Sequence, residues 1–295
     1  MKSIVLSLCG LFFAASLWAQ NQFTDHSTTV VSYFRQWEQK TYHVKRQQYK
    51  SINGQKNFLD DARYNLRLTV VKAAEDHYAI DALYTNFSNA SNGNLNDIPD
   101  SLMVRYGTDE MGSFWQIVNA DEVSNKLVAA LEKVPRTEQN AAAIEEERQK
   151  RLSKDYLEEI FIKDIRLLHL PYGMEYDQQN PIVAPTKIPN LLGGKEPFPG
   201  TVTIALSKID TAKKWAKVII EQQLDQSKLS PILQAWTSEA NQNSTEKIAL
   251  PKVEASDSNV FEVDLESGWL QKAVFVRKTI INEVEQADIL ELVLQ

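Results

Sequence analysis

The chain has 295 residues, of which 43% are hydrophobic and 24% are charged, and its 32 Lys and Arg against 39 Asp and Glu give a formal net charge of −7. This composition suffices for one large globular domain or two smaller ones, and it excludes disordered and collagen-like chains. The excess of acids excludes the basic surface that nucleic-acid binding requires.

The first 19 residues have the layout of a secretory signal peptide. Lys2 precedes an apolar run that ends in small residues before Ala19, as in leaders that are cleaved. The run from 4 to 18 is shorter than the about 20 residues of a spanning helix, so we expect its removal and no stable membrane insertion afterwards. The single cysteine, Cys9, lies inside this run. We therefore expect a secreted or periplasmic protein that folds without disulfides.

The residues after the signal peptide predict antiparallel strands. Residues 63–71 alternate apolar and polar side chains, and the alternation resumes at 78–84 after an acidic turn. A period of two on both sides of a short polar turn predicts a hairpin. Residues 30–49 are aromatic and β-branched and predict one long or broken strand. Beyond an Asn- and Gly-rich loop, residues 101–106 and 114–118 predict two short strands.

Turn and helix signals follow these strands. Gly112 comes after two acids in a turn, and we expect it at a backbone position that a side chain would strain. Asn119 and Glu122 fit a capping box, which predicts a helix that begins at Ala120. Residues 138–170 predict a second helical region, in which the first half is solvated and the second half is densely apolar.

The chain divides most naturally at a proline-rich segment. Residues 174–200 predict one long irregular connection. We therefore expect a signal peptide at 1–19, an N-terminal part with strands and helices at 20–173, and a C-terminal part at 201–295 that packs with it. The last predicted strand is apolar enough to be central or covered. The C-terminal elements expected are strands at 201–206, 215–224, 260–265, 269–281 and 289–294 and a helix at 229–240.

These elements together predict an α+β fold, in which curved antiparallel β-sheets pack against a central helical segment on one sheet face. The order of elements, with the signal peptide and the absence of cysteine after it, resembles that of uncharacterised secreted envelope proteins of Gram-negative bacteria. It is also loosely similar to the lipoprotein-carrier half-barrels, where a curved sheet wraps a helix and leaves an apolar cavity. The similarity concerns the order of elements alone, so no functional residue follows from it.

Two stretches of the chain echo each other. Residues 108–118 and 264–274 both place an acid, a glycine and a tryptophan before a strand, which fits either an internal duplication or common hairpin turns. If the two turns met in space, their acids would form a pair of the kind that glycoside hydrolysis uses. Acids in tight turns are more often simple turn formers. The acids in question are Asp109, Glu110, Asp264 and Glu266.

The candidate ligand-binding residues are Trp115, Trp269 and Phe198. Each tryptophan would stack on a sugar or a lipid tail if it were exposed, and its alternative role is packing within the sheet. Phe198 follows a glycine pair and belongs either to a ligand loop or to a plain crossover. The four histidines lack the spacing of a zinc site, so we expect no metal and no other cofactor.

No motif in the sequence names a reaction, which favours a non-enzymatic protein. Three functions remain open. The first is a secreted or periplasmic binding or carrier protein for an apolar or lipid-like ligand, held in a cavity between sheet and helix. The second is a structural or assembly protein of the cell envelope, with another envelope protein as its partner. The third is a hydrolase that uses the turn carboxylates.

Overall fold

The structure, a computed structural model, describes residues 23–89, 99–158, 162–192, 196–242 and 249–295. The predicted signal peptide at 1–19 lies outside the described residues. Within the described ranges, no helix is both long enough and apolar enough to cross a lipid bilayer.

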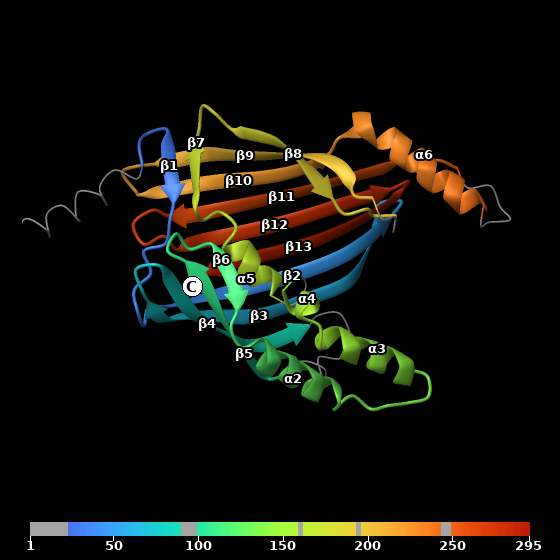
Figure 1. Cartoon of the computed structure of the whole chain (residues 1–295), viewed down its shortest axis with the longest axis horizontal. Helices are drawn as coiled ribbons and strands as arrows, with labels where there is room; N and C mark the ends of the chain where they lie inside the picture. Colours follow the sequence, from blue (N-terminus) through green and yellow to red (C-terminus); the bar gives the residue numbers. More distant parts are fainter. Residues whose placement is uncertain (1–22, 90–98, 159–161, 193–195, 243–248) are drawn as a thin grey trace, which may run out of the picture.

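One antiparallel sheet dominates the described structure. Its strands are β2 (Gln39–Ile52), β3 (Gln55–Ala73), β4 (His77–Asn89), β5 (Ser101–Asp109), β6 (Phe114–Ile117), β8 (Ile182–Ile188), β9 (Phe198–Asp210), β10 (Trp215–Leu224), β11 (Val253–Asp264), β12 (Leu270–Ile281) and β13 (Val284–Leu294). They follow one another in space in the order β6-β5-β4-β3-β2-β13-β12-β11-β10-β9-β8 (Figure 1). The pairing of β13 with β2 joins the strands of the two parts of the chain into a single sheet.

Shorter elements cover one face and the ends of this sheet. β1 (Ser27–Val30) and β7 (Met174–Asp177) pair with each other and lie in front of the sheet together with α5 (Lys163–Leu168) (Figure 1). The helices α2 (Ala120–Leu131) and α3 (Ala141–Arg151) lie beyond β5 at the lower border of the sheet in this view, α4 (Lys154–Tyr156) follows, and α6 (Gln226–Gln242) lies at the opposite end.

The expectation of an α+β fold with a central helical segment is wrong, because strands account for 53% of the structure and helices for 20%. Residues 138–170 do not form a continuous helical layer. Ser153 adopts extended backbone angles between α3 and α4 (φ −80°, ψ 131°) and interrupts the helix there. The strands are also longer than the periodicity indicated. In β3 the residues before 61 are exposed or half-buried, so their sequence shows no apolar alternation.

Several local predictions are confirmed. The hairpin expected at 63–71 and 78–84 forms the halves of β3 and β4 that lie next to their turn. The strand expected at 215–224 is β10, and the last strand lies centrally, between β2 and β12. The segment 174–200, by contrast, is not one irregular connection as expected, because it contains β7, β8 and the first three residues of β9. β8 is an edge strand of the sheet and carries Pro185 in its middle.

The helix predicted after Asn119 begins at Ala120, but the capping box is wrong, since Asn119 makes no side-chain cap hydrogen bond. Its Oδ1 accepts a hydrogen bond from the backbone N–H of Arg105 (2.7 Å), and its amide nitrogen donates to the carbonyl of Met103 (3.2 Å). The asparagine therefore ties the start of α2 to β5, because the nearby strand offers its side chain both a donor and an acceptor.

The two faces of the sheet differ in character. We call the face that carries β1, β7 and α5 the inner face. Alternate residues point to it, and near the middle of the sheet these are buried apolar side chains, such as the cross-strand row of Val44, Leu292, Ala273, Phe261 and Val218. A second cross-strand row lies four residues away from the first, which is about 13 Å at 3.3 Å per residue. Its inward side chains are polar: Gln48, Asp288, Arg277, Asp257 and Gln222.

Candidate functional site

An open cavity of about 560 Å³ lies on the inner face, where α5 and the strands β6 and β7 approach β12. Its volume is within the roughly 300–1,000 Å³ that small-molecule sites occupy. Among the described residues that line it, three are cationic and none is an acid. We call it the inner-face cavity; its lining residues are Ser113, Phe114, Lys163, Arg166, Leu167, His169, Leu170, Tyr172, Met174 and Arg277.

A buried carboxyl holds α5, and with it one wall of the cavity, against the sheet. Asp164 is 3% exposed, and its two oxygens accept hydrogen bonds from the hydroxyls of Tyr64 and Tyr84, at 2.8 Å each. Burial raises the pKa of Asp164, although these hydrogen bonds oppose the rise. Ile165 and Leu168 of α5 are buried beside it. The helix is short, so its position depends on these contacts rather than on intrinsic helix stability.

The cationic groups of the cavity belong to a chain of alternating charges. The guanidinium of Arg277 donates two hydrogen bonds to the carboxylate of Asp257 (2.8 and 2.6 Å), which raises the pKa of Arg277. Asp288 lies directly opposite Arg277 on the neighbouring strand and accepts a hydrogen bond from Nζ of Lys163 (2.7 Å). We call Asp257, Arg277, Asp288 and Lys163 the charged row. It links β11, β12 and β13 to α5.

The cations of the charged row keep hydrogen-bond donors to spare. A guanidinium has five N–H groups and an ammonium three, and the contacts to Asp257 and Asp288 use two and one of them. The side chain of Arg277 is 50% exposed and that of Lys163 is 33% exposed. Arg166, the third cationic lining residue, donates to the backbone carbonyl of Glu158 (3.2 Å). The cavity therefore presents cationic hydrogen-bond donors beside an apolar wall, which consists of Phe114, Leu167, Leu170 and Met174.

His169 closes the back of the cavity as a neutral side chain. It is 4% exposed, and burial lowers its pKa to about 4. Nδ1 lies 2.7 Å from the carbonyl oxygen of Gly112, and the hydroxyl of Tyr106 lies 2.8 Å from Nε2. The network assigns the proton to Nδ1, which donates to Gly112, while Nε2 accepts from Tyr106. Both ring nitrogens are thus engaged, and His169 has a structural role.

The two echoing turns do meet in space, around residues 31–33. Gly112 has φ +101°, and a Cβ atom on it would lie 2.8 Å from the ring of Tyr172 and 2.9 Å from Cβ of Ser32. A Cβ atom on Gly268 (φ +74°) would overlap the backbone of the same segment. The hydroxyl of Tyr172 donates to the carbonyl of Gly268 (2.6 Å). The prediction that a side chain would strain the position of Gly112 is confirmed.

The acids of these turns do not form a facing pair. Oδ1 of Asp109 accepts hydrogen bonds from the backbone N–H groups of Met111 and Ser113, and Oδ1 of Asp264 accepts from those of Glu266 and Ser267, at 2.8 to 3.1 Å. Both are turn formers. Glu110 is exposed, and Glu266 forms an exposed ion pair with Lys214 (2.9 Å). In the described part of the chain no group of three or more His, Cys, Asp or Glu side chains is placed to hold a metal ion.

The three candidate ligand-binding residues lie in three different places. Trp115 is 66% exposed on the edge strand β6. Trp269 is 1% exposed and stacks on Phe34, with 4.0 Å between the ring centroids. Phe198 is fully buried in a small core that it shares with Leu229 of α6. The structure does not bring them together, and none lines the inner-face cavity. A ligand-binding role for them stays a prediction.

Sequence reasoning missed the charged row, although the sequence contains a signal for it. Arg277 has the same strand parity as the buried Ala273 and Phe275, so it occupies an inward position. Asp257 and Asp288 likewise occupy positions of β11 and β13 where the alternation would place a buried apolar side chain. Charges at inward positions of strands expected to be neighbours mark a polar patch on a core face. The pairing of these charges with Lys163 required the structure.

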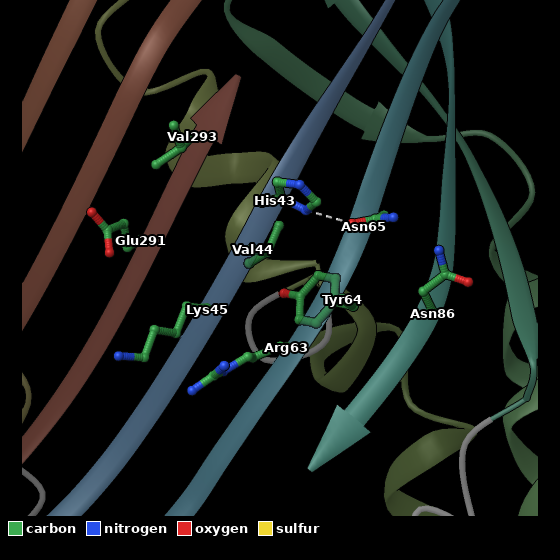
Figure 2. A pocket seen from close by; sticks show the side chains of 9 residues that line it. All are labelled: His43, Val44, Lys45, Arg63, Tyr64, Asn65, Asn86, Glu291 and Val293. Atoms are coloured by element: carbon green, nitrogen blue, oxygen red, sulfur yellow. Dashed lines mark hydrogen bonds between the residues drawn. The ribbon is translucent and has the colours of Figure 1, made fainter. Parts of the chain in front are cut away.

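A smaller depression of about 370 Å³ lies on the outer face, opposite α5, and spans β13, β2, β3 and β4. Figure 2 shows its side chains, among them Lys45, Arg63 and Glu291 on neighbouring strands. Nδ1 of His43 lies 2.7 Å from Oδ1 of Asn65. Lys45, Arg63, Asn86 and Glu291 are polar, and the depression offers less apolar surface, mainly from Val293, than the inner-face cavity does. It is therefore the weaker candidate for a ligand that is apolar.

No protein-family model matches the chain, and no curated protein matches its sequence. Neither comparison supports the resemblance to Gram-negative envelope proteins. Among solved structures, the chain is similar to one titled "Lipid-protein interactions in lipovitellin", with a TM-score of 0.45 and 8% sequence identity over 89% of this chain and 25% of that chain. The chain thus spans about a quarter of the length of that relative, and a likeness this low says nothing about what this chain binds.

Proposed function

We propose that the chain is a non-enzymatic binding or carrier protein for an apolar or lipid-like ligand, and that the ligand occupies the inner-face cavity. The observation that carries the proposal is the apolar wall of this cavity. Phe114, Leu167 and Met174 are partly buried against the main core and line the cavity, and Leu170 is 39% exposed beside them. An apolar body placed there would remove surface from water on both partners, which favours binding.

The apolar contact alone supports modest affinity. Each methylene group removed from water contributes about 0.8 kcal/mol, so about five methylenes against the wall contribute about 4 kcal/mol. This free energy corresponds to a dissociation constant of roughly 1 mM. A physiological ligand therefore needs either a larger apolar body or a polar group that the cavity recognises in addition.

The proposal includes export of the protein, because the sequence begins with the layout of a signal peptide. Expression of the full chain in a Gram-negative host, followed by fractionation and N-terminal sequencing, tests it. We expect a mature chain in the periplasm or the medium that starts at Gln20. A full-length chain that stays in the cytoplasm would refute export.

The binding proposal is tested with N-phenyl-1-naphthylamine, a neutral probe whose fluorescence rises in apolar sites. We expect a saturable rise with the wild-type chain and its loss in Leu167→Glu, because the new carboxylate places a charge on the apolar wall. The matched control is Val183→Glu, at a 63% exposed position on β8 outside the cavity lining, which should bind as the wild type does. Thermal unfolding of both variants is the check that they fold. If Leu167→Glu binds the probe as tightly as the wild type does, the proposal that the ligand occupies this cavity is refuted.

An assembly role is the second candidate, and an exposed apolar surface favours it. Ile52, Phe58 and Leu59 are 49%, 48% and 58% exposed at the tip of the β2–β3 hairpin. Exposed apolar side chains near the tip of one hairpin can take part in a contact with another protein. A purified envelope partner that binds the wild type, and not a Phe58→Ser/Leu59→Ser variant, would support this role. Binding that survives the double substitution would exclude this surface.

A further inference from the structure

We infer that the ligand of the inner-face cavity is an amphipathic anion, whose carboxylate or phosphate group binds between Arg277 and Lys163 while its apolar body packs on Leu167 and Met174. This inference rests on the proposed function and gives the chemical class of the ligand. It is carried by the charged row, whose cations line the same cavity as the apolar wall.

The charged row has no evident reason in stability. Its three strand residues, Asp257, Arg277 and Asp288, occupy inward positions of β11, β12 and β13, and the row of buried apolar side chains described above lies four residues away along these strands. Ion pairs that keep partial contact with water contribute little to folding, and apolar residues in place of a buried pair are often as stable or more stable. A continuous apolar inner face would therefore fold at least as well, and the charges indicate a polar group that the face has to receive.

The geometry favours an anion over a neutral or cationic group. The two carboxylates of the charged row, Asp257 and Asp288, are already bound to Arg277 and Lys163 and do not line the cavity. The cavity side of the row consists of the cations, with N–H groups left over. An anionic oxygen would accept these N–H groups in charge-assisted hydrogen bonds, which are about twice as strong as neutral ones. A cationic head group would meet like charges.

The position of the cations also sets the orientation of the ligand. Arg277 projects from the sheet and Lys163 from the start of α5, whereas Leu167 lies one turn further along that helix and Met174 begins β7. A ligand with its anionic group at the charged row therefore has its apolar body directed along α5 toward β7.

The test uses the full mature chain and four probes that share a ten-carbon chain and differ in the head group: decanoate, decyl phosphate, decanol and decyltrimethylammonium. Isothermal titration calorimetry at low salt gives their affinities. We expect decanoate and decyl phosphate to bind at least about tenfold more tightly than decanol, through the charge-assisted contacts, and decyltrimethylammonium to bind most weakly. The tighter of the two anions then distinguishes a carboxylate ligand from a phosphate ligand.

Variants connect this preference to the charged row. The double variant Asp257→Asn/Arg277→Gln replaces one ion pair by two neutral amides that can hydrogen-bond to each other, and its thermal unfolding should stay close to that of the wild type. It should lose the preference for the anions and bind decanol as the wild type does. The control is Arg63→Gln, which removes an arginine on the outer face and should change none of the four affinities.

Two failures are distinguishable. If decanol binds in the cavity and the anions bind no more tightly, or if the double variant keeps the anion preference, the inference about the ligand class is refuted and the binding function stands. If none of the four probes binds, both the inference and the proposed binding function are refuted.

Discussion

The buried His169 makes the stability of the protein depend on pH in a way that can be calculated from its environment. The pKa of this histidine falls from 6.5 to about 4 on burial. Below pH 6.5 the unfolded chain binds a proton that the folded chain does not, so the free energy of unfolding falls as the pH falls from 6.5 toward 4 and levels off below. At about 1.36 kcal/mol for each pH unit, this group lowers the free energy of unfolding by about 2 kcal/mol at pH 5 and by about 3 kcal/mol at most.

The matched perturbation is His169→Gln, because a glutamine amide offers one donor for the Gly112 carbonyl and one acceptor for the Tyr106 hydroxyl but does not titrate. Urea unfolding of both proteins at pH 7, 6, 5 and 4.5 isolates the histidine, since all other groups titrate in both. We expect the difference between wild type and variant to change by about 2 kcal/mol between pH 7 and pH 5. Parallel stability curves for the two proteins, or an NMR titration that shows a protonated ring at pH 5.5 in the folded state, would refute the reasoning.

Three further predictions concern the elements around the cavity. The pKa of Asp164 is raised by burial, so the stabilisation that this group gives is present at low pH and is lost as the pH rises above 3.8 through the raised value. Asp164→Asn should remove this pH dependence in urea unfolding. Asp164→Ala should cost about 1–3 kcal/mol for each tyrosine hydroxyl that loses its partner. Gly268→Ala should lower the free energy of unfolding by more than about 3 kcal/mol, because the new Cβ atom would overlap the backbone of residues 31–33. The control is Gly54→Ala, which has a similar φ but open space around it and should cost only about 1–2 kcal/mol. Equal costs for the two variants would show that the close approach at Gly268 is easily relieved. Asn119→Ala should cost about 0.5–1.5 kcal/mol by removing the hydrogen bond to the N–H of Arg105, which lies at an exposed position. Hydrogen exchange should then speed up at that amide and not only at the start of α2.

The sequence predicted those strands that bury one face and expose the other. In the hairpin of β3 and β4, the buried Leu66, Leu68 and Ile80 alternate with polar residues, and this period of two is a local signal. The signal fails at the other end of β3, toward the turn that joins it to β2, where Phe58 and Leu59 are both exposed. The extent of β3 is fixed there by its pairing with β2, which no local pattern shows.

The candidate site could not be predicted from local patterns either, because it depends on contacts between residues that are distant in sequence. Lys163 and Asp288 are paired across a helix and a strand that are distant in sequence, and their pairing depends on the order of strands in the sheet. The echo between the two glycine turns was visible in the sequence. The structural role of the echo was not visible there, because the two turns meet at the segment around Ser32 and the ring of Tyr172. Their aspartates accept hydrogen bonds from backbone N–H groups of their own turns instead of facing each other.

The prolines of β8 have a consequence for how the molecule meets other molecules. An open sheet has two edges whose free N–H and C=O groups can recruit a further strand. Pro181, Pro185 and Pro189 recur every four residues in and beside β8, so their nitrogens face one side of the strand and offer no hydrogen there. At the other edge, β6 has only four residues. Growth of the sheet by strand addition is therefore suppressed at both edges, and the exposed Ile182 and Val183 are tolerated without inviting fibril-like stacking.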